Sequence, residues 1–478
     1  MKPSFNLLDR GWIPVVFPDG SIQELGIRET LEKAHELREI SDPSPLEEYS
    51  VYRFLGLFLM DALRPRKKSS IRNLLREGKF DKEQIEKYIA QCQSEGVCFD
   101  LFDESKPFLQ TSWGQDFKND MKPVDVLDCT APSGNNHTHF CHAGRERIQA
   151  SEAARLLLNT YLFCTAAAQG YPSGVYGAPP LFSVIKGGNL FETLVSLFVP
   201  TEIIGIPFDD PPVLWRRTAP IQPKASIGST SWLQGLLFPT RRVQLVPDKD
   251  GSVIGVCLSQ GENYANKETW RDPGATYRTD KEGKPFPLRP HADAPIWRNV
   301  CDILDIPGEH ASLILRLYQS LHPDETVHLT LYGAETNQAS YLSVQRHDFS
   351  FPLRLAESER IELLSKCIEA AHRMYRALRR ALSDVGVIPS ASVSTALGNY
   401  DKACEERFWA MCDRAGDPLV DVREQYSSFC NDVCDSVLMT FDQTLAAIRL
   451  RAHKLALAEE KRDRLFFEAN KLKKEANS

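Results

Sequence analysis

The sequence predicts an α+β protein in which a large mixed N-terminal domain with long loops (residues 1–352) precedes a C-terminal four-helix bundle (residues 353–478). The first observation is the length of 478 residues, which is enough for about two to four domains. The second is the composition of residues 171 to about 350, where proline and glycine interrupt short strand-like runs. The third is the helical spacing of apolar residues after residue 353.

The N-terminal part begins with a predicted hairpin and helix. Residues 12–17 are strand-like, residues 18–20 (Pro-Asp-Gly) form a turn, and residues 28–38 have the alternating charges of an exposed helix. A longer helix is expected from about Leu46, because apolar side chains recur there every three or four residues. Residues 80–93 predict another helix.

The middle of the chain contains a predicted helix over residues 152–168, with Ser151 as its N-cap and Gly170 beyond its end. This helix opens an uncharged stretch, but its apolar part is only about 20 Å long at ~1.5 Å per residue, too short to cross a membrane. Short strands are expected at residues 242–246, 252–258, 327–332 and 341–345, the last two as a hairpin.

The C-terminal bundle is predicted from four amphipathic segments, which are residues 357–382, 400–414, 419–445 and 447–476. The large apolar residues expected in its core are Trp409, Phe429, Leu438, Phe441 and Phe466. Cys430 and Cys434 lie one helical turn apart and are expected to pack as small apolar groups.

The formal net charge of −7 argues against a chain that binds nucleic acid over its whole surface, but the charge is unevenly distributed. Residues 213–300 carry a net +5 and residues 449–475 a net +4, which leaves −16 on the remainder. Because a phosphate backbone responds to the local field, the two basic stretches are candidate contact regions. The simpler interpretation is that they are solvated surface.

The twelve cysteines include no C-x-x-C pair, and the N-terminus does not resemble a signal peptide. These features predict a cytoplasmic protein with reduced thiols and without structural zinc. The standard phosphate-loop, dinucleotide, nucleophile-elbow and zinc-protease motifs are also missing from the sequence, so no linear motif indicates an enzymatic activity, and we expect no cofactor. Histidines and carboxylates could still form an active site that no linear motif marks.

One cluster leaves a catalytic alternative open. Residues 133–142 hold His137, His139 and His142, whose side chains are chemically suited to a transition metal. Alternate positions of a strand share a face, so His142 would point away from the other two unless the segment is a sharp loop. A metal-dependent nuclease that uses these histidines with carboxylates is therefore the alternative to a polar loop anchored by Phe140.

Two further segments have residue types suited to close contact with a ligand. Residues 170–177 (Gly-Tyr-Pro-Ser-Gly-Val-Tyr-Gly) allow close approach of the backbone to a narrow or flat ligand, although alone they describe a flexible turn. Residues 337–340 form the expected tip of a hairpin, where Gln338 beside Ala339 has the right size to enter a DNA groove and disturb stacking. Taken alone, this segment is a loop.

Together and in this order, these features resemble the CasA family, the large subunits of type I-E CRISPR Cascade complexes. The resemblance covers essentially the whole chain. It rests on residues 5–15 (FNLLDRGWIPV), the loop at 133–140, the glycine segment, residues 186–194 (KGGNLFETL), residues 337–339 followed by Arg346-His347-Asp348, and the helical bundle.

The resemblance implies a non-catalytic subunit that reads the protospacer-adjacent motif through the minor groove of double-stranded DNA, promotes duplex opening and R-loop formation, and recruits a helicase–nuclease. Its implied partners are the other Cascade subunits, the crRNA in the assembled complex, the target duplex and the displaced strand, without a membrane. The basic last helix could hold that strand through its phosphates.

The family's contacts carry over by position. The implied DNA-contacting residues are Ser173, Gly174 and Val175 in the glycine segment, Asn337, Gln338 and Ala339 at the hairpin tip, and Lys267 and Arg271 in the region of a basic finger. The implied loop towards crRNA and neighbouring subunits contains Asn136, Phe140 and His142.

The chain departs from the family pattern at several points. Some relatives have paired C-x-x-C zinc sites that are missing from this sequence, which is a second reason to expect no bound metal. His142 stands where the best-known pattern has Asn, and residues 272–290 are divergent.

Overall fold

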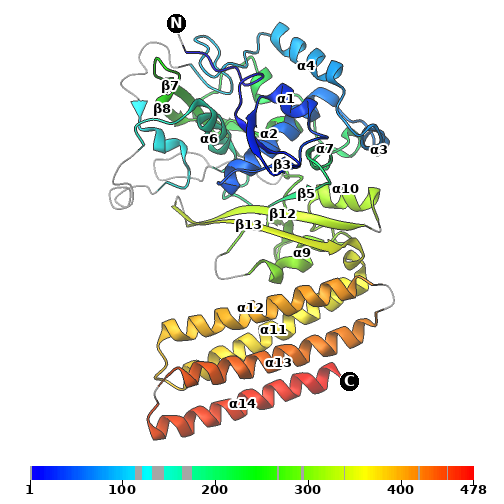
Figure 1. Cartoon of the computed structure of the whole chain (residues 1–478), viewed down its shortest axis with the longest axis vertical. Helices are drawn as coiled ribbons and strands as arrows, with labels where there is room; N and C mark the ends of the chain where they lie inside the picture. The colour runs from blue at the N-terminus through cyan, green and yellow to red at the C-terminus, as the bar shows by residue number, and fades with distance from the viewer. Residues whose placement is uncertain are drawn as a thin grey trace. The chain divides into compact units, whose positions relative to one another are not determined.

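The computed structural model describes residues 3–112, 121–131, 145–163, 175–265, 269–291, 295–323, 325–337, 340–417, 420–448 and 450–477. It has two compact units. Unit 1 comprises Met1–Ala292, Ala311–Leu321 and His328–Phe349, and unit 2 comprises Asp293–His310, His322–Val327 and Ser350–Ser478. The mixed α+β class with a C-terminal four-helix bundle is confirmed (Figure 1). A domain division at residues 352 and 353 stays a prediction.

Unit 1 begins with the predicted hairpin, β1 (Ile13–Val16) and β2 (Ile22–Leu25), and β3 (Glu39–Ile40) pairs on the other side of β1. Helix α1 (Ile27–Glu32) is shorter than expected. The reason is that the chain must turn after residue 33 to bring Glu39 alongside Val16 in the sheet.

The central helix of unit 1 is α2 (Pro45–Leu63), which is confirmed. Proline at the first helical position and the Ser44 side chain, which accepts a hydrogen bond from the Glu47 amide, define its start. Almost all of α2 is buried, because other helices surround it (Figure 1). These are α4 (Lys82–Ser94), α6 (Ala150–Leu162), α7 (Leu190–Val195) and α8 (Trp232–Leu236).

Two details of the helices differ from expectation. Helix α6 begins at Ala150 with Gln149 as its N-cap, so the assignment of Ser151 as N-cap is wrong. Its start is set by Ile148, which forms a β-bridge to Val253 and keeps the chain extended up to that point. Helix α3 (Lys68–Glu77) was not predicted, because it is short and largely polar and buries only Ile71.

The strands of unit 1 form small sheets, and the predicted strands are confirmed within them. One sheet has the order β4-β8-β7, another has the order β13-β12-β5, and two further pairs are β10-β11 and the parallel β6-β9. The bounds are β4 (Met121–Lys122), β5 (Phe182–Lys186), β6 (Ser226–Ile227), β7 (Arg241–Pro247), β8 (Val253–Gln260), β9 (Asn263–Tyr264), β10 (Tyr277–Thr279), β11 (Pro285–Pro287), β12 (Thr326–Asn337) and β13 (Ser340–Pro352).

Short helical segments connect these elements. The α-helices among them are α9 (Val300–Leu304) and α10 (Leu313–Leu321). The 3₁₀ turns are η2 (Val124–Leu127), η3 (Thr201–Ile203), η4 (Leu214–Arg216), η5 (Ile296–Asn299) and η6 (Leu353–Ala356).

The bundle of unit 2 contains α11 (Ser358–Asp384), α12 (Ser390–Ala415), α13 (Val422–Ala446) and α14 (Ala452–Ala476), which pack side by side (Figure 1). Helix α12 begins ten residues earlier than expected, since its first turns are polar and lack periodicity. None of the helices in the described ranges is both long and apolar enough to cross a membrane.

The bundle core contains most of the expected residues. Phe429 and Phe441 are buried, as are Cys430 and Cys434, whereas Trp409 and Leu438 are half-buried. The placement of Phe466 in the core is wrong, because its side chain is 48% exposed. The inward positions of α14 are taken by Leu465, Ala469 and Leu472, which share one helical face.

Candidate nucleic-acid interface

The described residues around the predicted DNA-contacting segments meet on one face of α2. Tyr49 is fully buried there, and its ring stacks on Phe182 of β5 at a centroid distance of 4.5 Å. The same ring touches Tyr332 of β12 at 5.6 Å and Phe163, the residue after α6, at 5.8 Å. Tyr49 therefore connects α2 to three elements that are far apart in the sequence.

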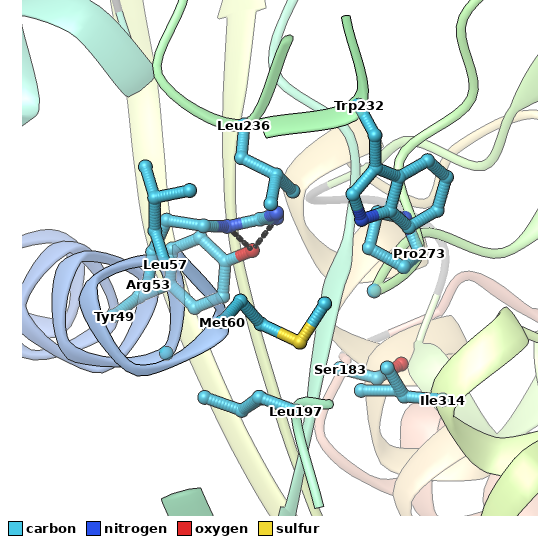
Figure 2. A pocket seen from close by; sticks show the side chains of 12 residues that line it. Tyr49, Arg53, Leu57, Met60, Ser183, Leu197, Trp232, Leu236, Pro273 and Ile314 are labelled. Carbon is cyan, nitrogen blue, oxygen red and sulfur yellow. Dashed lines mark hydrogen bonds between the residues drawn. The ribbon is translucent and has the colours of Figure 1, made fainter. Parts of the chain in front are cut away.

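One turn further along α2, Arg53 forms a buried ion pair with Asp272. Its Nη2 lies 2.7 Å from both carboxylate oxygens, and its Nε donates to the Tyr49 hydroxyl at 3.0 Å. Figure 2 shows the Arg53–Tyr49 contact from close by. Burial is the largest single effect and lowers the pKa of Arg53, but the Asp272 carboxylate together with Tyr49 and Tyr176 outweighs it and raises the pKa above its ordinary value. The guanidinium therefore stays charged.

Asp272 also accepts hydrogen bonds from two other segments. The Tyr176 hydroxyl donates to Oδ2 at 2.7 Å, and the Gly274 amide donates to Oδ1 at 2.8 Å. The Asp272 amide in turn donates to the Tyr277 hydroxyl at 2.9 Å. Burial raises the pKa of Tyr176, and the neighbouring Asp272 charge adds to the effect, so this hydroxyl stays protonated and remains a donor.

We call the residues Tyr49, Arg53, Tyr176, Asp272 and Tyr277 the Asp272 cluster. Beside it lies a cavity of about 30 Å³, which has room for a water molecule but not for a nucleotide or an organic cofactor (Figure 2). Two buried polar atoms on the lining residues, Ser183 Oγ and Trp232 Nε1, have no hydrogen-bond partner in the described parts of the chain.

The β12–β13 pair is attached to α2 by a second buried carboxylate, Glu48. The hydroxyl of Tyr332 donates to its Oε1, and Arg346 of β13 lies 3.3 Å from its Oε2. Lys186 of β5 is a third partner, with its Nζ 3.7 Å from Glu48 Oε1. Burial raises the pKa of Glu48, while these partners act in the opposite direction.

Three of the predicted DNA-contacting residues lie in the described ranges. Val175 is only 3% exposed, so its side chain belongs to the core and only its backbone is available for a contact. Asn337 is exposed at the end of β12, and Arg271 is exposed with its guanidinium 5.7 Å from the centre of the Tyr277 ring. Their roles stay predictions.

The other predicted site residues lie outside the described residues. These are Ser173, Gly174, Lys267, Gln338 and Ala339 among the DNA contacts, and Asn136, Phe140 and His142 in the loop towards crRNA and subunits. The histidines of the nuclease alternative, His137, His139 and His142, lie outside as well. Within the segments that are described, no group of three His, Cys, Asp or Glu side chains is placed to hold a metal ion.

The basic stretch at residues 213–300 is less positive than its formal charge suggests. Arg216 pairs with Asp61 and Glu95 at 3.0 and 2.8 Å, Arg217 pairs with Glu262 at 2.6 Å, and Arg298 pairs with Asp401. These arginines neutralise carboxylates of the protein itself. Among the described residues, Arg271 and Arg289 are exposed and form no ion pair with a carboxylate, so fewer groups contribute to the surface charge of this stretch than its formal charge suggests.

Sequence reasoning missed the residues that organise this region. Arg53 lies in a helix whose apolar spacing predicts only core packing. Asp272 lies 219 residues away from it, in a stretch without a motif. Tyr176 belongs to the glycine segment but was not singled out. Arg289 donates from Nη2 to the Tyr176 carbonyl at 3.3 Å. The two residues are 113 positions apart, so no local pattern could have linked them.

Comparison with known proteins identifies a family. The family model described as CRISPR-associated protein Cse1 matches residues 6–425. A curated relative, CRISPR-associated protein CasA/Cse1 of Thermus thermophilus, is 30% identical over 405 residues, which cover 80% of this chain and 78% of the relative.

Solved structures of the family have the same fold. Thermus thermophilus CasA superposes with a TM-score of 0.78 at 25% identity, over 97% of this chain and 99% of that one. Thermobifida fusca Cse1 gives 0.83 at 20% identity, over 98% of each chain. A chain of the CRISPR RNA-guided surveillance complex gives 0.77 at 19% identity, over 97% and 100%. The resemblance to CasA is thereby confirmed, and the chain belongs to the Cse1 family of CRISPR-associated proteins.

Proposed function

We propose that this chain is the non-catalytic large subunit of a type I-E Cascade complex, in which it recognises the protospacer-adjacent motif of double-stranded DNA through the minor groove. It promotes duplex opening and R-loop formation and recruits the helicase–nuclease. A structural relative is a chain of the CRISPR RNA-guided surveillance complex, which supports assembly with other subunits and guide RNA.

The observation that carries this proposal is the convergence of the three predicted DNA-contacting segments. The glycine segment (residues 170–177), the region of Lys267 and Arg271, and the hairpin tip (residues 337–340) are far apart in the sequence, yet described residues in or near them are bonded to one another. Tyr176 is bonded to Asp272, and Tyr341 is bonded to Phe163, which lies seven residues before the glycine segment. Segments linked in this way can act on one short stretch of duplex.

The chemistry of these segments suits the minor groove. Its edges present a degenerate pattern, so glycine backbone, alanine and lysine contacts would accept several related motifs. A glutamine inserted beneath the motif would unstack a base step and start duplex opening. Sequence specificity would then come from base pairing with the guide RNA, as in other RNA-guided effectors.

The test is R-loop formation by the complex assembled with Gln338→Ala. We expect duplex opening on motif-bearing targets to fall by about tenfold, the equivalent of about 1.4 kcal/mol, because the wedge is lost. Gln91→Ala on α4 is the matched control, since Gln91 is an exposed glutamine whose side chain donates to Glu95 on the same helix. Unchanged R-loop formation with Gln338→Ala would overturn this assignment.

The nuclease alternative stays open as a prediction and has its own test. A nuclease assay of the isolated chain with divalent metals, together with elemental analysis, would distinguish the two functions. Stoichiometric metal and cleavage that is lost in His137→Ala would favour the nuclease. A metal-free chain without cleavage supports the subunit role.

A further inference from the structure

We propose that Tyr176 and Asp272 are positioning residues, which hold the glycine segment and the basic finger in one fixed relation so that both read the same DNA motif. This inference rests on the proposed function and goes beyond it, because neither residue is expected to touch DNA. It concerns the described residues that border the two segments, Val175–Tyr176 on one side and Thr269–Asp272 on the other.

The first argument is the burial of the link. The Asp272 side chain is fully buried, and both of its oxygens are bonded to Arg53, with Tyr176 and Gly274 as further donors. A buried ion pair contributes little net stability compared with apolar packing, but it has one arrangement of lowest energy and specifies the geometry of the groups that form it. Here the groups come from α2, the glycine segment and the finger region.

The second argument is the local pattern around Arg271. Trp270 and Asp272 on either side are buried, and Arg271 between them is exposed. Trp270 fits closely against Gly235, where an added Cβ would lie 2.1 Å from the indole. The chain is therefore fixed on both sides of Arg271, whose side chain is exposed.

The third argument is a second link across the same boundary. Arg289, which follows β11, donates to the Tyr176 carbonyl at 3.3 Å. Strand β10 pairs with β11 in a hairpin and contains Tyr277, whose hydroxyl accepts a hydrogen bond from the Asp272 amide at 2.9 Å. Tyr176 is thus held through its side chain and through its backbone, and both contacts lead to the segment from Arg271 to Arg289.

The most conservative variant that tests the positioning role is Tyr176→Phe. It removes the hydroxyl but leaves the ring, which packs against Phe182 at 5.6 Å and Trp270 at 6.0 Å. Asp272 keeps its contact with Arg53, so no buried charge is left unpaired. Tyr400→Phe is the matched control, because Tyr400 is also buried and its hydroxyl donates to the Ala371 carbonyl in the bundle at 3.0 Å.

The experiment measures the affinity of the assembled complex for three targets that match the guide. One is a duplex with the motif, one is a duplex with an altered motif, and one is a single strand, which needs no motif reading. For Tyr176→Phe we expect the preference for the motif duplex to fall about fivefold, with single-strand affinity unchanged. Tyr400→Phe should leave both quantities as in the wild type.

The possible outcomes distinguish failure of the positioning role from failure of the proposed function. If the wild-type complex prefers the motif and Tyr176→Phe keeps the full preference, the positioning role is overturned while the proposed function stands. An equal loss on the single strand assigns Tyr176 to folding or assembly and also overturns it. If the wild-type complex has no preference for the motif, the proposed function itself fails, and the positioning role fails with it.

A second variant keeps the positioning role testable if the complex with Tyr176→Phe does not assemble. Tyr277→Phe removes the acceptor of the Asp272 amide without touching the carboxylate, and we expect a smaller loss of motif preference in the same direction. Failure of both variants to assemble, with normal assembly of Tyr400→Phe, would make these residues structural and overturn the proposal.

Discussion

The hydroxyl of Tyr341 donates a hydrogen bond to the backbone carbonyl of Phe163, a residue 178 positions earlier in the chain. Tyr341 is the second residue of β13, directly after the hairpin tip, and Phe163 directly follows α6. The bond therefore holds the strand that follows the predicted wedge against the C-terminal end of α6, seven residues before the glycine segment.

Tyr341→Phe is expected to separate motif recognition from duplex opening. The variant loses one hydrogen bond, which stabilises the fold by about 1 kcal/mol, so unfolding should be little affected. R-loop formation on motif-bearing duplexes should slow by about three- to tenfold, because the wedge is held less firmly relative to the glycine segment. Stopped-flow fluorescence of a base analogue beside the motif measures this rate, and an unchanged rate would contradict the account.

Arg289→Ala is expected to weaken duplex binding by the assembled complex and to reduce its salt dependence. An exposed guanidinium that contacts a phosphate contributes about one unit to the slope of log affinity against log salt. Titrations between low and moderate salt give that slope. Arg76→Ala on α3 is the control, since Arg76 is an exposed arginine whose guanidinium donates to Asn73 on the same helix. An unaltered slope for Arg289→Ala would exclude a phosphate contact at this position.

Gly235→Ala is expected to destabilise unit 1 by about 1–3 kcal/mol, because the new methyl group would overlap the Trp270 ring. The shift of the indole should also change the tryptophan fluorescence of the folded chain. Gly228→Ala is the control, because a Cβ at Gly228 would meet no atom within 4 Å. Urea unfolding followed by fluorescence checks both, and equal stabilities of the two variants would show that the fit of Trp270 is not tight.

The buried carboxylate Glu47 predicts a pH dependence of stability. Burial raises its pKa from 4.5 to about 7, and the Asp42 carboxylate adds to this while Arg155 acts against it. The folded chain then binds a proton more tightly than the unfolded chain, so the free energy of unfolding should decrease as the pH rises from about 4.5 to about 7.

Glu47→Gln should remove this dependence, which amounts to at most about 3 kcal/mol. Urea unfolding at the two ends of the pH range measures it, with Glu459→Gln on α14 as an exposed control. A wild-type slope retained in Glu47→Gln would assign the pH dependence to other groups.

The sequence predicted the elements that depend on local pattern. The helix at Leu46, the hairpin around residues 337–340 and the four bundle helices are all marked by periodicity or turn residues, and all are present. Phe466 was misplaced because it neighbours Leu465 on α14, and periodicity does not decide which of two adjacent apolar residues faces inward.

The arrangement of the site could not be predicted in the same way. The Arg53–Asp272 pair and the Tyr341–Phe163 bond join residues more than a hundred positions apart, and no local pattern marks their partners. The charge count pointed to residues 213–300, but it could not show that Arg216 and Arg217 are paired internally. Which cations reach the surface is a property of the fold.

The measurement that tests the account most directly is a gel shift of the assembled complex on targets that share one guide-matched sequence and differ only in the flanking motif. The account predicts a shifted R-loop complex on the motif-bearing duplex, at least about tenfold weaker binding when the motif is altered, and little binding of either duplex by the free chain, whose net charge is −7. Equal affinity for the two duplexes, or tight motif-independent binding by the free chain, would contradict it.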